Sequence, residues 1–137
     1  LVAIARLLQR AQRIMAAGRS VGSVRATVST LVPKPYTPYH REPMLDHRQW
    51  RHRLNLVQRE LRGEPGIRVD RGSHREAVWQ GFLSRGDASA FSLLAQAASG
   101  QPLGRLLAEN REEIRRVALS RWEDDAVWHF VVPARSG

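Results

Sequence analysis

The chain has 137 residues, enough for one domain with a hydrophobic core and too few for two comfortable domains. It contains no cysteine, which excludes a disulfide, a thiolate zinc site and an iron–sulfur cluster held by this chain alone. Its hydrophobic fraction is 42% and no long uncharged apolar run occurs, so we expect a cytoplasmic, soluble chain with no membrane partner.

The net charge of +9 is compatible with nucleic-acid binding, because clustered cations release counterions from phosphate backbones. Only Lys34 is a lysine, and the arginines occur in every segment instead of forming one stripe. Such an arginine bias also arises from coding composition. Nucleic-acid binding is therefore kept as an alternative.

Residues 1–17 predict an amphipathic helix, because the apolar residues recur at helical spacing opposite arginines and glutamines. Gly18 is expected to end it in the left-handed conformation. A chain that opens inside a helix without an initiating Met is expected to be cut from something longer.

Residues 24–32 alternate β-branched and polar residues, which predicts a strand. The only other strand candidate is the brief segment 67–70, and an isolated pair of strands is marginal in water. This order of helix, strand, loop and helix suits the last units of a parallel sheet or barrel whose earlier strands are not in this chain.

The loop after this strand carries Pro33, Pro35, Pro38 and Pro43, which predict a stiff, extended backbone. Lys34 is thereby presented with little entropy to lose on meeting an anion. The alternative is that Lys34 points into solvent and the prolines only end the strand. Junctions between strand and loop are where α/β folds place their sites.

Asp46 and Gln49 predict a capping box for a helix at 47–62, with a buried stripe of Trp50, Leu54, Val57 and Leu61. The other side of this helix is strongly basic. His47 and His52 are five residues apart, so a solvated basic face is favoured over a zinc site.

Further helices are predicted after a turn at 63–66. Ser73 and Glu76 predict a second capping box, opening a helix that ends at Arg85-Gly86-Asp87, where Asp87 would cap the next helix. That next helix is expected to run through Phe91, Leu94, Ala95 and Ala98 to Gly100. Residues 103–118 continue at helical spacing, as one helix or as two broken near Asn110, and residues 126–133 predict an irregular apolar tail. No Ser-His-Asp order and no glycine-rich phosphate loop is present.

Three stretches resemble the radical S-adenosylmethionine family, whose closer relatives often carry an N-terminal cobalamin-binding domain. The run 28–44, VSTLVPKPYTPYHREPM, is similar to the family's VSxFVPKPxTPFQWxPM signature. Residues 83–87 resemble its LSRGD segment, and residues 124–130 resemble its closing LPWD-like tail. Tyr39 and His40 replace Phe-Gln, and Arg41 stands where Trp is usual, which implies a more polar and cationic substrate wall.

The resemblance implies the fold class: an α/β chain in which residues 1–45 are the last helix-strand-loop unit of a partial (β/α) barrel and residues 46–137 are a mainly helical region. It implies S-adenosylmethionine and a [4Fe-4S] cluster as cofactors of the parent protein, with cobalamin use left open. Its CxxxCxxC cluster loop would lie upstream of residue 1, so the partners are the upstream part of the same polypeptide and an unidentified small-molecule substrate. The cluster would donate an electron to cleave S-adenosylmethionine, giving a radical that abstracts hydrogen from the substrate.

The resemblance places no catalytic residue and no metal ligand in this chain, which is not expected to be active alone. Ser29, Thr30 and Lys34 are the candidate cofactor-binding residues. Tyr36, Thr37 and His40 are the candidate substrate wall. Arg85 and Asp87 are expected to fix the region that covers the barrel mouth. Two alternatives stay open, a basic helical nucleic-acid-binding domain and a non-catalytic interaction module.

Overall fold

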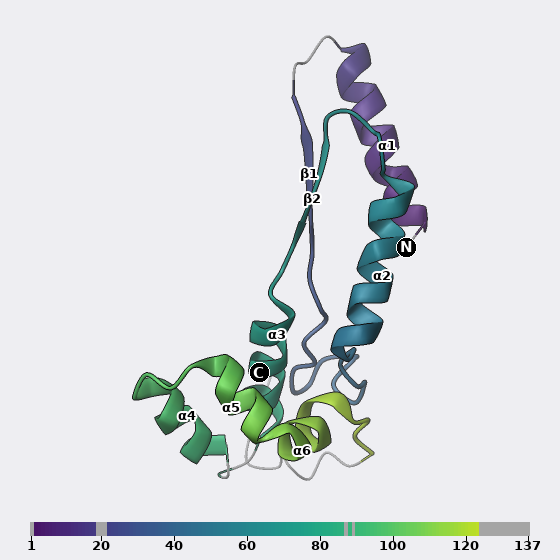
Figure 1. The fold of residues 1–137 in the computed structure, drawn as a ribbon. Coiled ribbons are helices and arrows are strands. Elements are labelled where there is room, and N and C mark those ends of the chain that lie inside the picture. Colours follow the sequence, from purple (N-terminus) through teal and green to yellow (C-terminus); the bar gives the residue numbers. More distant parts are fainter. Residues whose placement is uncertain (1, 19–21, 87, 89, 124–137) are drawn as a thin grey trace, which may run out of the picture. The chain divides into compact units, whose positions relative to one another are not determined.

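The structure, a computed structural model, describes residues 2–18, 22–86, 88 and 90–123. The described residues form a mixed α/β fold in which helices predominate and one small parallel sheet is present (Figure 1). They group into two compact units. The strand unit comprises Leu1–Thr30 and Asp46–Ser73, and the helical unit comprises Leu31–Leu45 and His74–Gly137. Both units are discontinuous in sequence; the expected division at residue 45 stays a prediction about the larger fold.

The strand unit contains helix α1 (Val2–Ala17), strand β1 (Val24–Val28), helix α2 (His47–Glu60) and strand β2 (Ile67–Arg71). The two strands pair in parallel, from Val24 opposite Ile67 to Val28 opposite Arg71. The expected strand at 24–32 is therefore shorter than predicted, and the brief segment at 67–70 is its partner. Pairing ends where Gly72 N donates to Val28 O at 3.0 Å.

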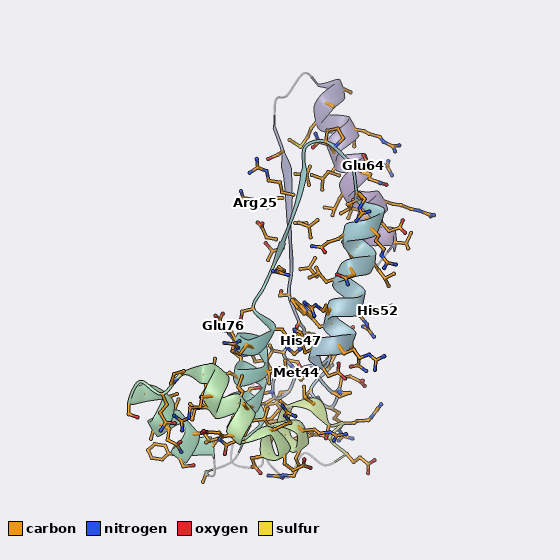
Figure 2. The ribbon with its side chains drawn as sticks, viewed as in Figure 1. Arg25, Met44, His47, His52, Glu64 and Glu76 are labelled. Carbon is orange, nitrogen blue, oxygen red and sulfur yellow. The ribbon has the colours of Figure 1, made fainter. Side chains whose placement is uncertain are left out.

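Both helices of the strand unit lie on one side of its sheet (Figure 1). The core on that side comprises Ala5, Leu8, Val57, Leu61, Ile67 and Val69. The opposite face is polar and exposed, and on it Arg25 pairs with Asp70 at 3.4 Å (Figure 2). Exposed ion pairs of this kind contribute about 0–1 kcal/mol to the free energy of unfolding. They therefore stabilise the open face of the sheet much less than a packed layer of apolar side chains would. The sheet is covered on one face only.

The predictions for α2 that rested on its N-terminal cap and on its buried stripe are confirmed. Asp46 accepts from Gln49 N at 2.7 Å and its own N–H donates to Gln49 Oε1 at 3.1 Å, which confirms the capping box. The stripe of Trp50, Leu54, Val57 and Leu61 is buried as predicted. Helix α1 ends at Ala17, next to Gly18, as predicted, but Gly18 is not left-handed: its φ is not positive, and its N–H donates to Ile14 O at 3.2 Å.

The helical unit contains α3 (His74–Arg85), α4 (Ala90–Ala98), α5 (Leu103–Glu109), α6 (Arg111–Ile114) and a π-helical turn, η1 (Arg115–Leu119). The helical stretch at 103–118 is therefore broken at Asn110, the second of the two alternatives. The core of this unit comprises Met44, Val78, Phe82, Ala90, Leu93, Leu106, Ile114, Val117 and Ala118.

Helix α4 buries only part of its apolar surface. Ala90 and Leu93 are buried, whereas Phe91 is 71% exposed and Leu94 is 43% exposed. Nearly every residue of this helix is apolar, so its sequence does not mark one face as the core. Asp87, the expected cap of this helix, and the tail at 126–133 lie outside the described residues. None of the described helices has the length and apolar character needed to cross a bilayer.

Gly81 in the middle of α3 provides a test of the packing in the helical unit. A Cβ at this position would lie 2.1 Å from Met44 Sδ. Replacing an interior helical Gly with Ala normally stabilises by about 1 kcal/mol. We expect Gly81→Ala to lower the free energy of unfolding by about 1–3 kcal/mol instead, measured by urea titration, because overpacking outweighs propensity.

The control for this prediction is Gln80→Ala, an exposed change on the same helix, expected to stay within about 0.5 kcal/mol of the parent. In a Met44→Ala background the clash is gone, and Gly81→Ala should become neutral or stabilising. A destabilisation of the same size in both backgrounds would contradict the Met44 contact as its cause.

Candidate functional site

The segment Leu31–Leu45, here called the proline loop, is built from successive tight turns. Thr37 donates to Lys34 O through its N–H at 3.3 Å and its hydroxyl at 2.8 Å. His40 N donates to Thr37 O at 3.0 Å, and Glu42 N donates to Tyr39 O at 3.0 Å. Together with the fixed φ angles of the prolines, these bonds leave the backbone few alternatives. The loop is a preorganised platform.

The hydrogen bonds around His40 assign the tautomer of its ring. Nδ1 lies 2.6 Å from Thr37 O, and because a carbonyl only accepts, Nδ1 carries the hydrogen. Nε2 then accepts from Arg41 Nε at 3.2 Å. The His40 ring thus orients the Arg41 guanidinium.

Tyr36 is the one described residue other than glycine with a positive φ, at 57°. It follows Pro35 in the turn from Lys34 to Thr37, at the position where a type II turn requires φ above zero and where Gly is preferred. A bulky residue there is strained. The side chain is 55% exposed, so core packing does not explain it.

Arg85, the last residue of α3, holds the proline loop in place. Its side chain is completely buried. Nη2 donates to His40 O at 2.6 Å and also to Glu42 O, both in the proline loop. Nη1 donates to the carbonyls of Ala118 at 3.3 Å and Ser120 at 3.2 Å, at the end of η1. One guanidinium therefore joins the loop, α3 and the segment after η1.

The charge of Arg85 is solvated by carbonyl dipoles and one aromatic face. Burial lowers the pKa of its guanidinium, and the nearby Glu42 carboxylate partly opposes that shift. Its Cζ lies 5.6 Å from the centroid of the Trp122 ring, within range of a cation–π interaction. Nε is buried without a hydrogen-bond partner among the described residues. Burying the Arg85 guanidinium therefore costs desolvation free energy, and its hydrogen bonds hold the proline loop in one position.

Further contacts fasten the proline loop along its length. Ser84 donates to Pro33 O at 3.0 Å, and Trp122 N donates to Arg41 O at 3.0 Å. Met44 N donates to Ala118 O at 3.2 Å, and its side chain covers Gly81. The loop is therefore attached to the rest of the helical unit near its start, middle and end.

Four of the predicted site residues lie within this loop. Lys34 is exposed, and no ion pair or hydrogen bond is found for its ammonium among the described residues. Tyr36 is exposed, and Thr37 and His40 are half-buried. Hydrogen bonds place Thr37 against both Lys34 and His40, so these three residues are brought together by the local backbone.

The other two predicted site residues, Ser29 and Thr30, lie in the strand unit just after β1. Ser29 is exposed and lies against Gly72, where an added Cβ would come within 3.2 Å of the Ser29 Cβ. Thr30 is buried, and its hydroxyl has no hydrogen-bond partner among the described residues. Both follow the carboxyl end of a parallel strand, the edge at which α/β folds place ligands.

The three predicted cofactor-binding residues belong to different units, Ser29 and Thr30 to the strand unit and Lys34 to the helical unit. Ser29 and Thr30 supply hydroxyls, and Lys34 supplies an ammonium donor. Within the described part of the chain, no three His, Asp or Glu side chains gather in a way that would hold a metal ion.

Sequence reasoning missed two features that shape this site. The contact of Met44 with Gly81 was signalled by an isolated glycine inside a predicted helix, which often marks a close approach. The hydrogen bond from Ser84 to Pro33 had no sequence signal, because 51 residues separate the two.

The role of Arg85 is tested by Arg85→Lys. A lysine keeps the charge but cannot reach four carbonyls with one ammonium. We expect the free energy of unfolding to fall by about 3 kcal/mol, since buried carbonyls would lose their donors. Arg75→Lys, an exposed change on the same helix, is the matched control and should be near neutral. Equal stability of the two variants in urea would exclude Arg85 as an anchor.

The strain at Tyr36 is tested by Tyr36→Asn, because Asn tolerates the left-handed conformation. We expect the free energy of unfolding to rise by about 0.5–1 kcal/mol in thermal or urea unfolding. Tyr39→Asn serves as the control: Tyr39 is similarly exposed in the same loop, but its φ is not positive. A gain in both variants, or in neither, would rule out φ strain as the cause.

No protein family model matches the chain, and the searches of curated proteins and of solved structures returned no significant match.

Proposed function

We propose that this chain is the C-terminal segment of a radical S-adenosylmethionine enzyme and that the proline loop forms one wall of its cofactor and substrate cavity. The observation that carries the proposal is a contact between two of the stretches that resemble the family. Ser84 and Arg85, from the LSRGD-like segment, donate to the carbonyls of Pro33, His40 and Glu42 in the proline loop, which lies largely within the run 28–44 that resembles the longer signature. The contact between the two segments supports a common role for them, in which the segment at 83–87 holds the proline loop rigid.

The strand unit supports a place in a partial barrel. Its strands are parallel, its helices cover one face of the sheet, and the other face carries polar side chains. In a (β/α) barrel the helices lie outside and the inner face lines the site. Two strands alone leave both outer edges unpaired, which supports further strands from the upstream part of the polypeptide.

In this proposal Ser29, Thr30 and Lys34 would hold S-adenosylmethionine, with the Lys34 ammonium toward its carboxylate. Bound S-adenosylmethionine supplies the radical chemistry, and upstream cysteines supply the iron ligands that this chain lacks. Tyr36, Thr37 and His40 would orient the substrate and exclude water from it. The proposal includes a cytoplasmic location and leaves cobalamin use open.

The test uses the full-length polypeptide, including its upstream part, purified without oxygen and chemically reduced. We expect the upstream reading frame to hold a CxxxCxxC loop and the protein to form 5′-deoxyadenosine from S-adenosylmethionine. Lys34→Gln should raise the KM for S-adenosylmethionine about tenfold or more, because a charge-assisted hydrogen bond contributes about 1.5–3 kcal/mol.

Arg75→Gln, which removes an exposed charge outside the proline loop, is the control and should leave the KM unchanged. An upstream frame without three cysteines, or a reduced protein that forms no 5′-deoxyadenosine, would sink the proposal. An unchanged KM in Lys34→Gln would remove Lys34 from the cofactor site.

A further inference from the structure

The fold gathers nearly all of the net charge into the strand unit. That unit has twelve arginines and four acidic residues, whereas the helical unit has ten basic and nine acidic residues. The strand unit therefore carries +8 of the total of +9. Its two stretches are separated by fifteen residues in sequence, so the arginines look dispersed until the chain folds. The arginines of this unit occur on both helices and both strands, and four of them lie on α2.

One stripe of polar and cationic side chains runs along α2 and its C-terminal cap. Its members, here called the basic stripe, recur at intervals of three and four residues and are all exposed: Arg48, Arg51, His52, Asn55, Gln58, Arg59 and Arg62. The opposite side of the helix is buried in the strand unit. Figure 2 shows the His52 side chain projecting from α2 on the side away from the sheet. At about 1.5 Å per residue the stripe is about 21 Å long.

No carboxylate in the strand unit neutralises this stripe. Asp46 caps α2, Glu64 accepts from Gln9 at 2.9 Å, and Asp70 pairs with an arginine of β1. Glu60 falls outside the stripe by the 3.6-residue period. For the stripe's four arginines, the described part of the chain offers neither an ion pair nor a hydrogen bond to an acidic group. Four cations side by side repel one another, so an anionic partner would relieve a real cost.

The C-terminal half of the stripe is hollowed. A depression of about 360 Å³ is lined by Asn55, Gln58, Arg59 and Arg62. All four lining side chains carry N–H donors, and two are guanidinium groups. Paired guanidinium and amide donors without a carboxylate match the oxygens of a phosphate group.

We propose that the basic stripe binds the phosphate backbone of double-stranded DNA, with one phosphate seated in the hollow. The B-form major groove is about 12 Å wide and admits an α-helix, whereas the A-form groove of RNA is too narrow and deep. The stripe has no Phe, Tyr or Trp, so it lacks the stacking platform of single-strand binders. A membrane-surface helix would need a free apolar face, and that of α2 is buried. The inference rests on the strand unit alone and is independent of the proposed function.

The experiment measures binding of the full chain to a fluorescent 24-base-pair duplex by anisotropy, at several salt concentrations. The triple variant Arg51→Gln, Arg59→Gln, Arg62→Gln removes three charges from the stripe. Its matched control, Arg53→Gln, Arg111→Gln, Arg115→Gln, removes three exposed charges elsewhere, one of them on another face of the same helix. Glutamine and arginine have similar helix propensities, so neither set disturbs the helices.

We expect the stripe variant to bind at least tenfold more weakly at about 100 mM salt, and its log–log salt slope to be shallower by about 2.7, since each phosphate contact contributes about 0.9. The control should bind within about twofold of the parent, because only the long-range field changes. If the stripe variant loses its cooperative melt, Arg59→Gln alone should still shift the slope by about 0.9.

Three outcomes overturn the proposal. Equal weakening of the stripe and control variants would mean that binding follows net charge alone. Unchanged binding by the stripe variant would mean that the surface does not contact DNA. Tighter binding to single-stranded RNA, or to vesicles of phosphatidylserine and phosphatidylcholine, than to the duplex would assign the stripe to another partner.

Discussion

The buried guanidinium of Arg85 is the interaction on which the helical unit depends. A charge removed from water must be solvated by the protein, and here four backbone carbonyls and the Trp122 ring do so. Those carbonyls belong to the proline loop and to the segment after η1, which are far apart in sequence. The requirement to solvate one cation therefore fixes where both segments lie. Gly86, the next residue, has no room for a side chain, since a Cβ there would approach the Ala90 Cβ within 2.8 Å.

Anchoring of this kind explains how a loop can be both rigid and exposed. Carbonyls point inward to Arg85 and Ser84, while the Lys34 and Tyr36 side chains remain in solvent. The left-handed turn at Tyr36 persists because hydrogen bonds on both sides determine it. Conformational strain held in place by surrounding structure is common where side chains are positioned for a ligand. This rigidity is what the proposed cavity wall would require, because ordering the loop on binding would otherwise reduce affinity.

The strand unit follows a different physical rule. Its apolar groups cover one face of a two-stranded sheet, and four of its arginines are left on the exposed side of α2 and its C-terminal cap. Self-repulsion among them is tolerable only because they are exposed and screened. The like charges on one face of α2 and the N–H donors that line the depression do not help the chain to fold. They are properties of the exposed surface, where a ligand could meet them. The proposed DNA contact uses the exposed side of α2, whereas the proposed cavity wall uses the proline loop and the residues just after β1.

The sequence by itself determined what neighbours along the chain can decide. The Asp46 capping box, the buried stripe of α2 and the existence of the two strands all follow from spacing and local hydrogen bonding, whereas the sequence left a break at Asn110 as one of two alternatives. Tertiary structure decided what depends on residues brought from afar: which face of α4 is buried, which carbonyls solvate Arg85, and why Gly81 has no side chain. The concentration of charge in the strand unit belongs with these. Periodicity records only the local geometry of one segment, whereas burial and charge clustering are sums over segments that the fold alone places together.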